Sequence, residues 1–231
     1  MNNAKEDFVK LNSNVYMFTE EMTRKVEEIS SYMENNSYLI LNDDKSKAVV
    51  IDPSWNQKII QNFLDKYKIN LVAIIFTHSH FDHIGNSKIL KDKYKTKFYI
   101  NGNGKTILLN GYKDPKFQYD FKFRINDIEK IKIDEILNIH GIKLETLYTP
   151  GHSIDSTCFR YKNFIFSGDH LFVDSIGRTD FEFSDHLQMI ESLKKIIAWA
   201  KPNDILCPGH NKIELFSDVL KNNIFLKNIL D

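Results

Sequence analysis

The chain has 231 residues, which is enough to bury a sizeable hydrophobic core in one domain or in two small ones. It carries 31 basic and 31 acidic residues without a lysine or arginine block, and this balance argues against a dedicated nucleic-acid surface. Two cysteines are too few for a disulfide framework, the N-terminus lacks the apolar core of a signal peptide, and no apolar run reaches membrane-spanning length. We therefore expect a cytoplasmic protein that binds neither nucleic acid nor a membrane.

The first quarter of the chain alternates β-rich runs with charged or helical segments. Residues 14–18 predict a strand, and the charged segment 20–31 predicts a surface helix or a loop. Residues 37–41 and 47–51 are β-rich and flank an Asn-Asp-Asp sequence, which predicts a hairpin. Residues 55–68 place their apolar side chains on one helical face and predict a helix.

The most informative stretch is residues 71–86. Its first six residues are all apolar, a run too short for a buried helix and typical of a strand covered on both faces. Four possible metal ligands follow within six positions, namely His78, His80, Asp82 and His83. Packing three imidazoles and a carboxylate together without metal would cost desolvation, so we interpret this loop as a metal site rather than a histidine-rich surface turn.

The middle of the chain predicts a helix over 84–94 and a strand over 97–100. Residues 101–106 are similar to the end of a phosphate-binding loop, but Tyr99 occupies the position of its first glycine, which favours an ordinary strand-to-helix turn. In residues 117–125, aromatic and apolar residues alternate with polar ones. This aromatic ribbon is interpreted as an edge strand packed on the core, or alternatively as a substrate wall or a subunit contact.

The last third predicts strands around Ile131 and Leu144, a hairpin over 156–166, a strand over 205–207 and terminal helices. Ser184 is expected to cap a helix that ends at Ala200. The predicted buried stripe of that helix consists of Leu187, Ile190, Leu193, Ile197 and Ala200.

Three further motifs follow apolar, strand-like segments: Thr-Pro-Gly-His at 149–152, Ser-Gly-Asp at 167–169 and Pro-Gly-His at 208–210. Together with the His-x-His-x-Asp-His segment at 78–83, they resemble the metallo-β-lactamase superfamily in type and order. The resemblance covers most of residues 36–210. It implies an α/β (α+β) fold, specifically a four-layer αβ/βα sandwich, and we expect residues 1–231 to form a single domain of this kind because no linker-like stretch interrupts them.

The resemblance also implies a site that holds two divalent metal ions, with zinc preferred over iron or manganese. One ion would be held by His78, His80 and His152, the second by Asp82, His83 and His210, and Asp169 would bridge them. A metal-bound hydroxide would attack the substrate, with Asp82 and Asp169 as catalytic residues. The remaining polar candidates are expected outside the ligand set: His170 packs behind the site, His140 and His186 are solvated, and Cys207 is a buried thiol.

The segment Ser-Ile-Gly-Arg-Thr-Asp at 175–180 resembles the glyoxalase II-like branch, which hydrolyses thioesters such as hydroxyacylglutathione. Only 21 residues follow His210, too few for the helical extension with which the larger enzymes grip glutathione, so the compact members of the branch are the nearer match. The resemblance implies a small-molecule thioester or ester substrate. Arg178 and Asp180 would fix the loop or form a surface ion pair.

Two rival functions stay open from sequence. One is a mononuclear iron persulfide dioxygenase, which would use His78, His152 and Asp169 as a facial triad. The other is a nucleic-acid-processing hydrolase of the same fold, which the zero net charge disfavours. The sequence determines neither the physiological substrate nor the oligomeric state.

Overall fold

A computed structural model describes residues 8–26, 29–110 and 125–230, and two mixed β-sheets organise this part of the chain. The first sheet has seven strands in chain order, antiparallel from β1 to β4 and parallel from β4 to β7. Its strands are β1 (Phe8–Lys10), β2 (Val15–Val26), β3 (Ile29–Leu41), β4 (Lys47–Ile51), β5 (Asn70–Ile75), β6 (Phe98–Asn101) and β7 (Ile128–Ile131).

The second sheet has six strands in the order β13-β12-β11-β10-β9-β8, and every neighbouring pair except β11–β12 is antiparallel. Its strands are β8 (Ile136–Ile139), β9 (Ile142–Tyr148), β10 (Thr157–Tyr161), β11 (Phe164–Gly168), β12 (Ile205–Pro208) and β13 (Glu214–Leu215). The predicted hairpins at 37–51 and 156–166 are confirmed as β3–β4 and β10–β11.

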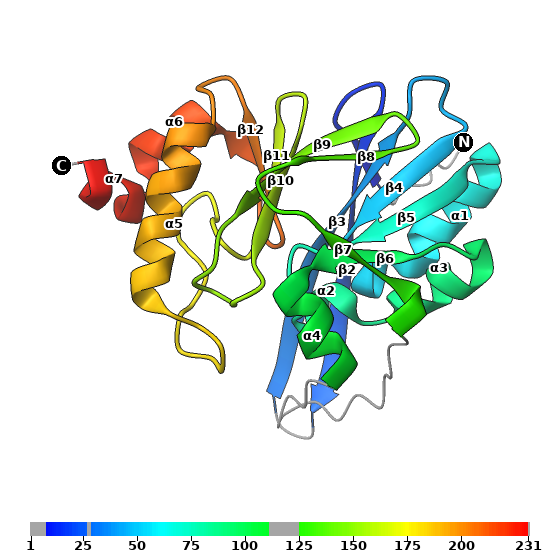
Figure 1. Ribbon diagram of the computed structural model, residues 1–231, viewed down its shortest axis with the longest axis horizontal. Helices are drawn as coiled ribbons and strands as arrows, with labels where there is room; N and C mark the ends of the chain where they lie inside the picture. The colour runs from blue at the N-terminus through cyan, green and yellow to red at the C-terminus, as the bar shows by residue number, and fades with distance from the viewer. Residues whose placement is uncertain (1–7, 27–28, 111–124, 231) are drawn as a thin grey trace.

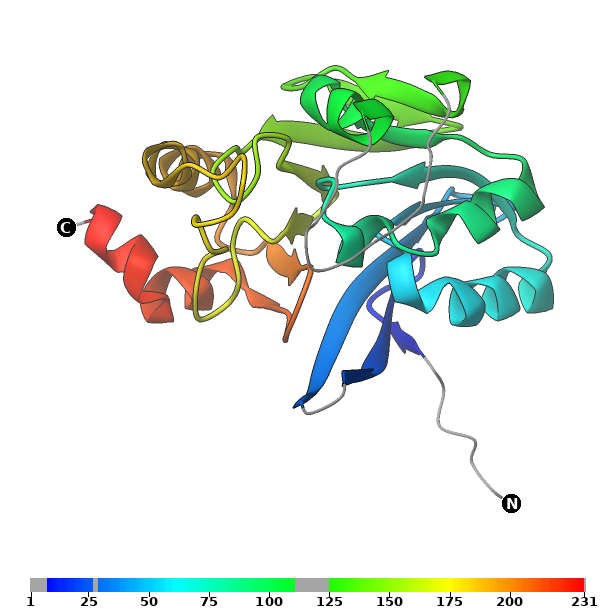
Figure 2. The same cartoon turned by 90° about the horizontal axis from the view of Figure 1, so that it is seen from below.

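Helices cover the outer face of each sheet, so the layers run helix, sheet, sheet, helix (Figures 1 and 2). The first sheet carries the short helix η1 (Ser54–Asn56) and helices α1 (Gln57–Tyr67), α2 (Phe81–Ile84), α3 (Ser87–Tyr94) and α4 (Gly102–Asn110), with η2 (Ile125–Asp127) leading into β7. The second sheet carries α5 (His186–Trp199), α6 (Phe216–Asn222) and α7 (Ile224–Leu230). The predicted four-layer αβ/βα sandwich is confirmed. None of the helices in the described ranges is long and apolar enough to cross a membrane.

Strand β5 shows why the central apolar run forms a doubly covered strand. Leu71, Ile74 and Phe76 belong to the core beneath α1 and α3, whereas Ala73 and Ile75 belong to the core between the two sheets. Because side chains alternate across a strand, a run with both faces buried must be apolar throughout. This strand is therefore held rigidly on both faces up to the loop that begins at Thr77.

The prediction for residues 20–31 was wrong, because β2 and β3 continue as one long antiparallel hairpin in which Thr19 pairs with Asn36 and Val26 with Ile29. Cross-strand backbone hydrogen bonds outweigh the weak helical pattern of this segment. The predicted helix over 84–94 is divided into α2 and α3, with Gly85 at the end of α2. The aromatic ribbon at 117–125 lies outside the described residues except for position 125, which begins the short helix η2.

Helix α5 begins one residue later than expected, and its buried stripe differs from the prediction. Asp185, not Ser184, caps it by accepting a hydrogen bond from the Gln188 amide at 2.9 Å. The side chain of Leu187 is 77% exposed. The buried positions are Met189, Ser192, Leu193 and Ile196. The loop before the helix determines which helix face is buried, because the Asp185 amide donates to the carbonyl of Gly151.

Candidate metal centre

The candidate ligands lie in the segments that leave β5, β9, β11 and β12, and two of them, Asp82 and His83, belong to the short helix α2. Short backbone hydrogen bonds join these loops across the sandwich. The amide of Thr157 donates to the Thr77 carbonyl at 2.9 Å, and the amide of Gly209 donates to the Gly168 carbonyl at 2.9 Å. The amide of Asn36 donates to the carbonyl of Gly209 at 2.8 Å. These hydrogen bonds fix the loops to one another.

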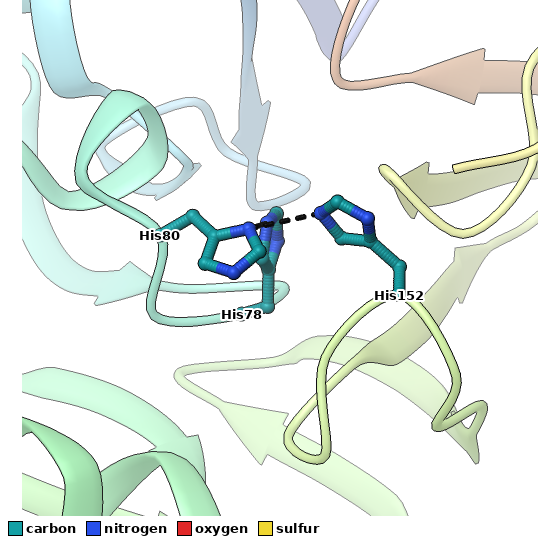
Figure 3. Close-up of side chains that lie close together, drawn as sticks. All are labelled: His78, His80 and His152. Atoms are coloured by element: carbon teal, nitrogen blue, oxygen red, sulfur yellow. Dashed lines mark hydrogen bonds between the residues drawn. The ribbon is translucent and has the colours of Figure 1, made fainter. Parts of the chain in front are cut away.

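One group of ligands consists of three histidines whose rings face one another (Figure 3). The Nδ1 atom of His80 lies 3.0 Å from Nε2 of His78 and 2.9 Å from Nε2 of His152. Burial, and then the positive charge of neighbouring imidazoles, lowers the pKa of His78 far below its usual value and that of His80 to about 3. Both rings are therefore neutral near pH 7, the protonation state in which imidazole coordinates a metal.

A second group contains Asp82, His83, Asp169 and His210. The Nε2 atom of His210 lies 3.2 Å from Asp82 Oδ2 and 3.4 Å from Asp169 Oδ2, and Nε2 of His83 lies 3.3 Å from Asp169 Oδ1. Burial disfavours the charged forms of these side chains, but the attraction between the carboxylates and the protonated imidazoles outweighs it. The pKa values of both carboxyl groups are lowered, the pKa of His83 is raised, and that of His210 rises to about 10.

Asp169 lies between the two groups, because its Oδ2 atom is also 3.8 Å from Nε2 of His152. Nε2 of His83 and Oδ1 of Asp169 lie 3.3 Å apart without the geometry of a hydrogen bond, and neither buried atom has another hydrogen-bond partner among the described residues. Native interiors rarely leave such atoms unmatched unless an ion or water completes them. Imidazole nitrogens and carboxylate oxygens that converge in this way fit zinc or another divalent transition metal in each group.

A carboxylate that sequence reasoning missed orients the second group. Asp52 is buried, and its Oδ2 atom lies 2.8 Å from Nδ1 of His83. Its two oxygens also accept hydrogen bonds from the amide and hydroxyl of Thr77, at 2.8 and 2.6 Å. One signal was available in the sequence: Asp52 follows β4 directly, and the carboxyl ends of neighbouring parallel strands meet at one edge of a sheet.

Two glycines allow the loops to approach this closely. A Cβ atom on Gly209 would lie 2.5 Å from Oδ1 of Asp169 and 2.6 Å from Cε1 of His83. Gly168 has φ of +51°, and a Cβ atom there would lie 2.3 Å from Oγ1 of Thr77. A side chain at Gly209 would displace the second ligand group, and one at Gly168 would displace Thr77, which precedes His78.

The structure brings all seven predicted ligands into these two groups and leaves the other histidines outside them. His170 is fully buried behind the site, where burial lowers its pKa to about 3. His140 and His186 are exposed, as expected. Arg178 and Asp180 form an exposed bidentate ion pair, with both hydrogen bonds at 2.6 Å. Arg178 also supports the site through its backbone, because Nδ1 of His152 lies 2.9 Å from its carbonyl oxygen.

An open cleft of about 560 Å³ begins beside the second ligand group. It is lined by residues of β2 and β3, by the segment after β11, which includes Phe172, and by Asn211 and Lys212, which follow His210. The ring centroid of Phe172 is 6.2 Å from that of His210.

The fold and the site define the class of this protein: a two-sheet αβ/βα protein whose loops assemble a paired His/Asp metal centre. Residues 33–210 match the family model of the Metallo-beta-lactamase superfamily, and the chain belongs to that superfamily. With the two ligand groups in place, it is a metal-dependent hydrolase of this fold.

Several known proteins are similar to it. It is 27% identical over 213 residues to the probable polyketide biosynthesis zinc-dependent hydrolase BaeB of Bacillus velezensis, covering 89% of this chain and 88% of that protein. It is 34% identical over 189 residues to a hydroxyacylglutathione hydrolase of Pelagibacter ubique, covering 80% and 70% respectively. The crystal structure of the BLEG-1 B3 metallo-beta-lactamase superposes with a TM-score of 0.75 at 26% identity, over 90% of this chain and 99% of that one.

Proposed function

We propose that this chain hydrolyses small-molecule thioesters with two zinc ions held by the two ligand groups. The observation that carries the proposal is the position of Asp169, whose carboxylate lies within 3.8 Å of imidazoles from both groups. A carboxylate shared in this way suits two ions a few Å apart. When bound, such a pair lowers the pKa of water and polarises a carbonyl group.

The protein's own side chains support water rather than a side chain as the nucleophile. Both cysteines of the chain, Cys158 and Cys207, are fully buried, and burial raises their pKa values, to about 12 for Cys158. A thiol with so high a pKa is not a thiolate near neutral pH and cannot attack a carbonyl carbon. The proposed role of His78, His80 and His152 is to hold one ion, while Asp82, His83 and His210 hold the other.

Asp82 is proposed as the proton acceptor. Its pKa is lowered despite burial, because His83 and His210 stabilise the carboxylate, so it is ionised near pH 7. One of its oxygens is 3.2 Å from Nε2 of His210, at the edge of the second group. A thiol leaving group has an ordinary pKa near 8.5, so it departs with little help from an acid. This chemistry favours a thioester over an amide as the substrate.

The similarity to a hydroxyacylglutathione hydrolase supports a thioester, because the substrate in that protein's name is an acyl thioester of glutathione. The similarity to a zinc-dependent hydrolase supports zinc. Neither relative identifies the acyl group or the thiol of this chain's own substrate.

The test is metal analysis of protein purified without added metal, followed by a thioester-hydrolysis screen before and after removal of metal with a chelator. We expect two ions per chain, activity that disappears on chelation and activity that returns with zinc. His78→Ala should abolish hydrolysis, whereas His186→Ala, which changes an exposed histidine, should retain it. A single iron per chain together with oxygen uptake on glutathione persulfide would replace this proposal with the dioxygenase.

A further inference from the structure

The loop between the metal centre and α5 exposes two phenylalanines. The side chains of Phe181 and Phe183 are 40% and 48% exposed, although most large apolar side chains of the described residues are buried. Phe183 also has φ of +65°, a backbone conformation that a bulky side chain rarely adopts. Strained aromatic positions of this kind concentrate at sites that bind ligands.

Three hydrogen bonds attach this loop to the loop that carries His152. The carbonyl of Arg178 lies 2.9 Å from Nδ1 of His152, and the hydroxyl of Ser184 donates to the His152 carbonyl at 2.6 Å. The amide of Asp185 donates to the carbonyl of Gly151 at 2.8 Å. Both ends of the segment are thus fixed to the metal centre, and a turn from Phe181 to Ser184 joins them.

The ring of Phe181 lies next to the three-histidine group. Its centroid lies 5.6 Å from that of His80 and 6.4 Å from that of His152. The guanidinium carbon of Arg178 sits 4.1 Å from the ring centroid and fixes its orientation. Two more exposed apolar side chains flank the anchoring points, Ile154 two residues after His152 and Leu187 two residues after Asp185. We call Ile154, Phe181, Phe183 and Leu187 the apolar rim.

We propose that the apolar rim binds the acyl chain of the substrate, so that the preferred thioesters carry a hydrocarbon acyl group of roughly six to ten carbons, a length that spans a few side chains. The inference rests on the proposed thioesterase function and adds the substrate class. Phe181 lies against the three-histidine group, and Phe183 belongs to the same turn, so a carbonyl bound at that group would have its attached chain beside this turn. The acyl half is the better occupant, because biological thiol carriers such as glutathione are rich in amides and charges, whereas exposed aromatic faces favour hydrocarbon.

The experiment measures kcat/KM for acyl N-acetylcysteamine thioesters from acetyl to decanoyl, in the wild type and in Phe183→Gly. Glycine accepts φ of +65° without strain, so this variant should melt at or above the wild-type temperature. Each added methylene should raise kcat/KM about twofold on a half-exposed surface, or about 60-fold over the six methylenes from acetyl to octanoyl. Phe183→Gly should reduce the octanoyl-to-acetyl ratio to about five or less. Tyr67→Ala, which changes an equally exposed aromatic on α1, should keep the full ratio.

A second readout separates this inference from the proposed reaction. Uncleavable S-alkyl-N-acetylcysteamine thioethers should bind more tightly with increasing chain length by calorimetry, and Phe183→Gly should remove that dependence. If no thioester were hydrolysed but the thioethers still bound with this dependence on chain length, the proposed reaction would be overturned and the proposed role of the rim supported. Three results would overturn the proposal that the rim binds the acyl chain. They are no effect of chain length in either assay, a chain-length effect that persists in Phe183→Gly, and a chain-length effect seen only when the chain is on the thiol half. If Phe183→Gly altered only the oligomeric mass of the protein in solution, the proposal would also be overturned, because the rim would then be a contact with a second copy of the chain.

Discussion

Oδ2 of Asp52 lies 2.8 Å from Nδ1 of His83, although 31 residues separate them in sequence. A carboxylate only accepts hydrogen bonds, so Nδ1 carries the proton and Nε2 is the atom turned towards Asp82 and Asp169. The same carboxylate accepts two hydrogen bonds from Thr77, next to His78. One buried side chain therefore sets the ring orientation in the second ligand group and fixes the start of the loop that carries the first.

We expect Asp52→Asn to weaken binding of one metal ion about 10–100-fold, the range for loss of a partner that orients a ligand. The substitution preserves shape but removes the charge that supports His83. The measurement is metal content per chain after dialysis against graded chelator. Asp44→Asn is the control, because that exposed carboxylate accepts hydrogen bonds from Ser46 in its own turn, away from the ligand groups. Equal metal retention in both variants would show that Asp52 has a purely structural role.

Asp169→Ala should lose both metal ions and at least about 1,000-fold in activity, because the bridge between the ligand groups is removed. His170→Ala should retain two ions and lose no more than about tenfold. Its main effect should be a lower melting temperature, since the ring is fully buried and its removal leaves a cavity. Metal analysis and thermal unfolding on the two variants separate these effects. Loss of an ion from His170→Ala would make His170 a ligand.

The sequence was sufficient for the ligands because they are local to four motifs, each of which follows an apolar strand. Strands with both faces covered, such as β5, can also be predicted from sequence, because burial on both faces requires a continuous apolar run. The sequence was insufficient for Asp52, whose importance comes from the lateral pairing of β4 with β5 and has no local pattern.

Two errors have a common physical origin, since tertiary contacts overrode local preference. The hairpin of β2 and β3 is held by cross-strand hydrogen bonds, which the charged sequence of this segment does not predict. The rotation of α5 follows from Ser184, which donates to the carbonyl of His152 instead of capping the helix, so Asp185 takes that role. The deciding partner lies on the neighbouring strand in the hairpin and on the His152 loop in α5.

Asp155 should act as a positioning residue for the three-histidine group. It is fully buried and accepts a hydrogen bond from the hydroxyl of Ser153. Burial raises its pKa, and Ser153 together with Ser79, which stands between His78 and His80, opposes that rise. Asp155→Ala would leave the buried hydroxyl of Ser153 unmatched, at a cost of about 1–3 kcal/mol, and would release the two loops from each other. We expect a lower melting temperature and weaker binding of one ion, with partial rescue in Asp155→Asn. Asp92→Ala, a surface control, should change neither.

The two ligand groups should differ in how pH affects their metal binding. Without metal, burial lowers the pKa of His210, but the carboxylates of Asp169 and Asp82 outweigh burial and raise it to about 10. The ring is therefore protonated at pH 7, and an ion can bind there only by displacing that proton. The pKa of His80 is about 3, chiefly because of burial, so protons do not compete for this ring above about pH 4.

Lowering the pH from 8 to 5 should therefore remove the ion of the second group first. Each displaced proton weakens apparent affinity about tenfold per pH unit below the pKa of the group that must release it. Equilibrium dialysis at fixed free zinc, followed by metal analysis, should show a fall from two ions to one. Zinc binding at pH 7 should release protons into a weakly buffered solution, and His210→Gln should release fewer. Simultaneous loss of both ions, or earlier loss of the ion held by His78, His80 and His152, would contradict this assignment of charge between the groups.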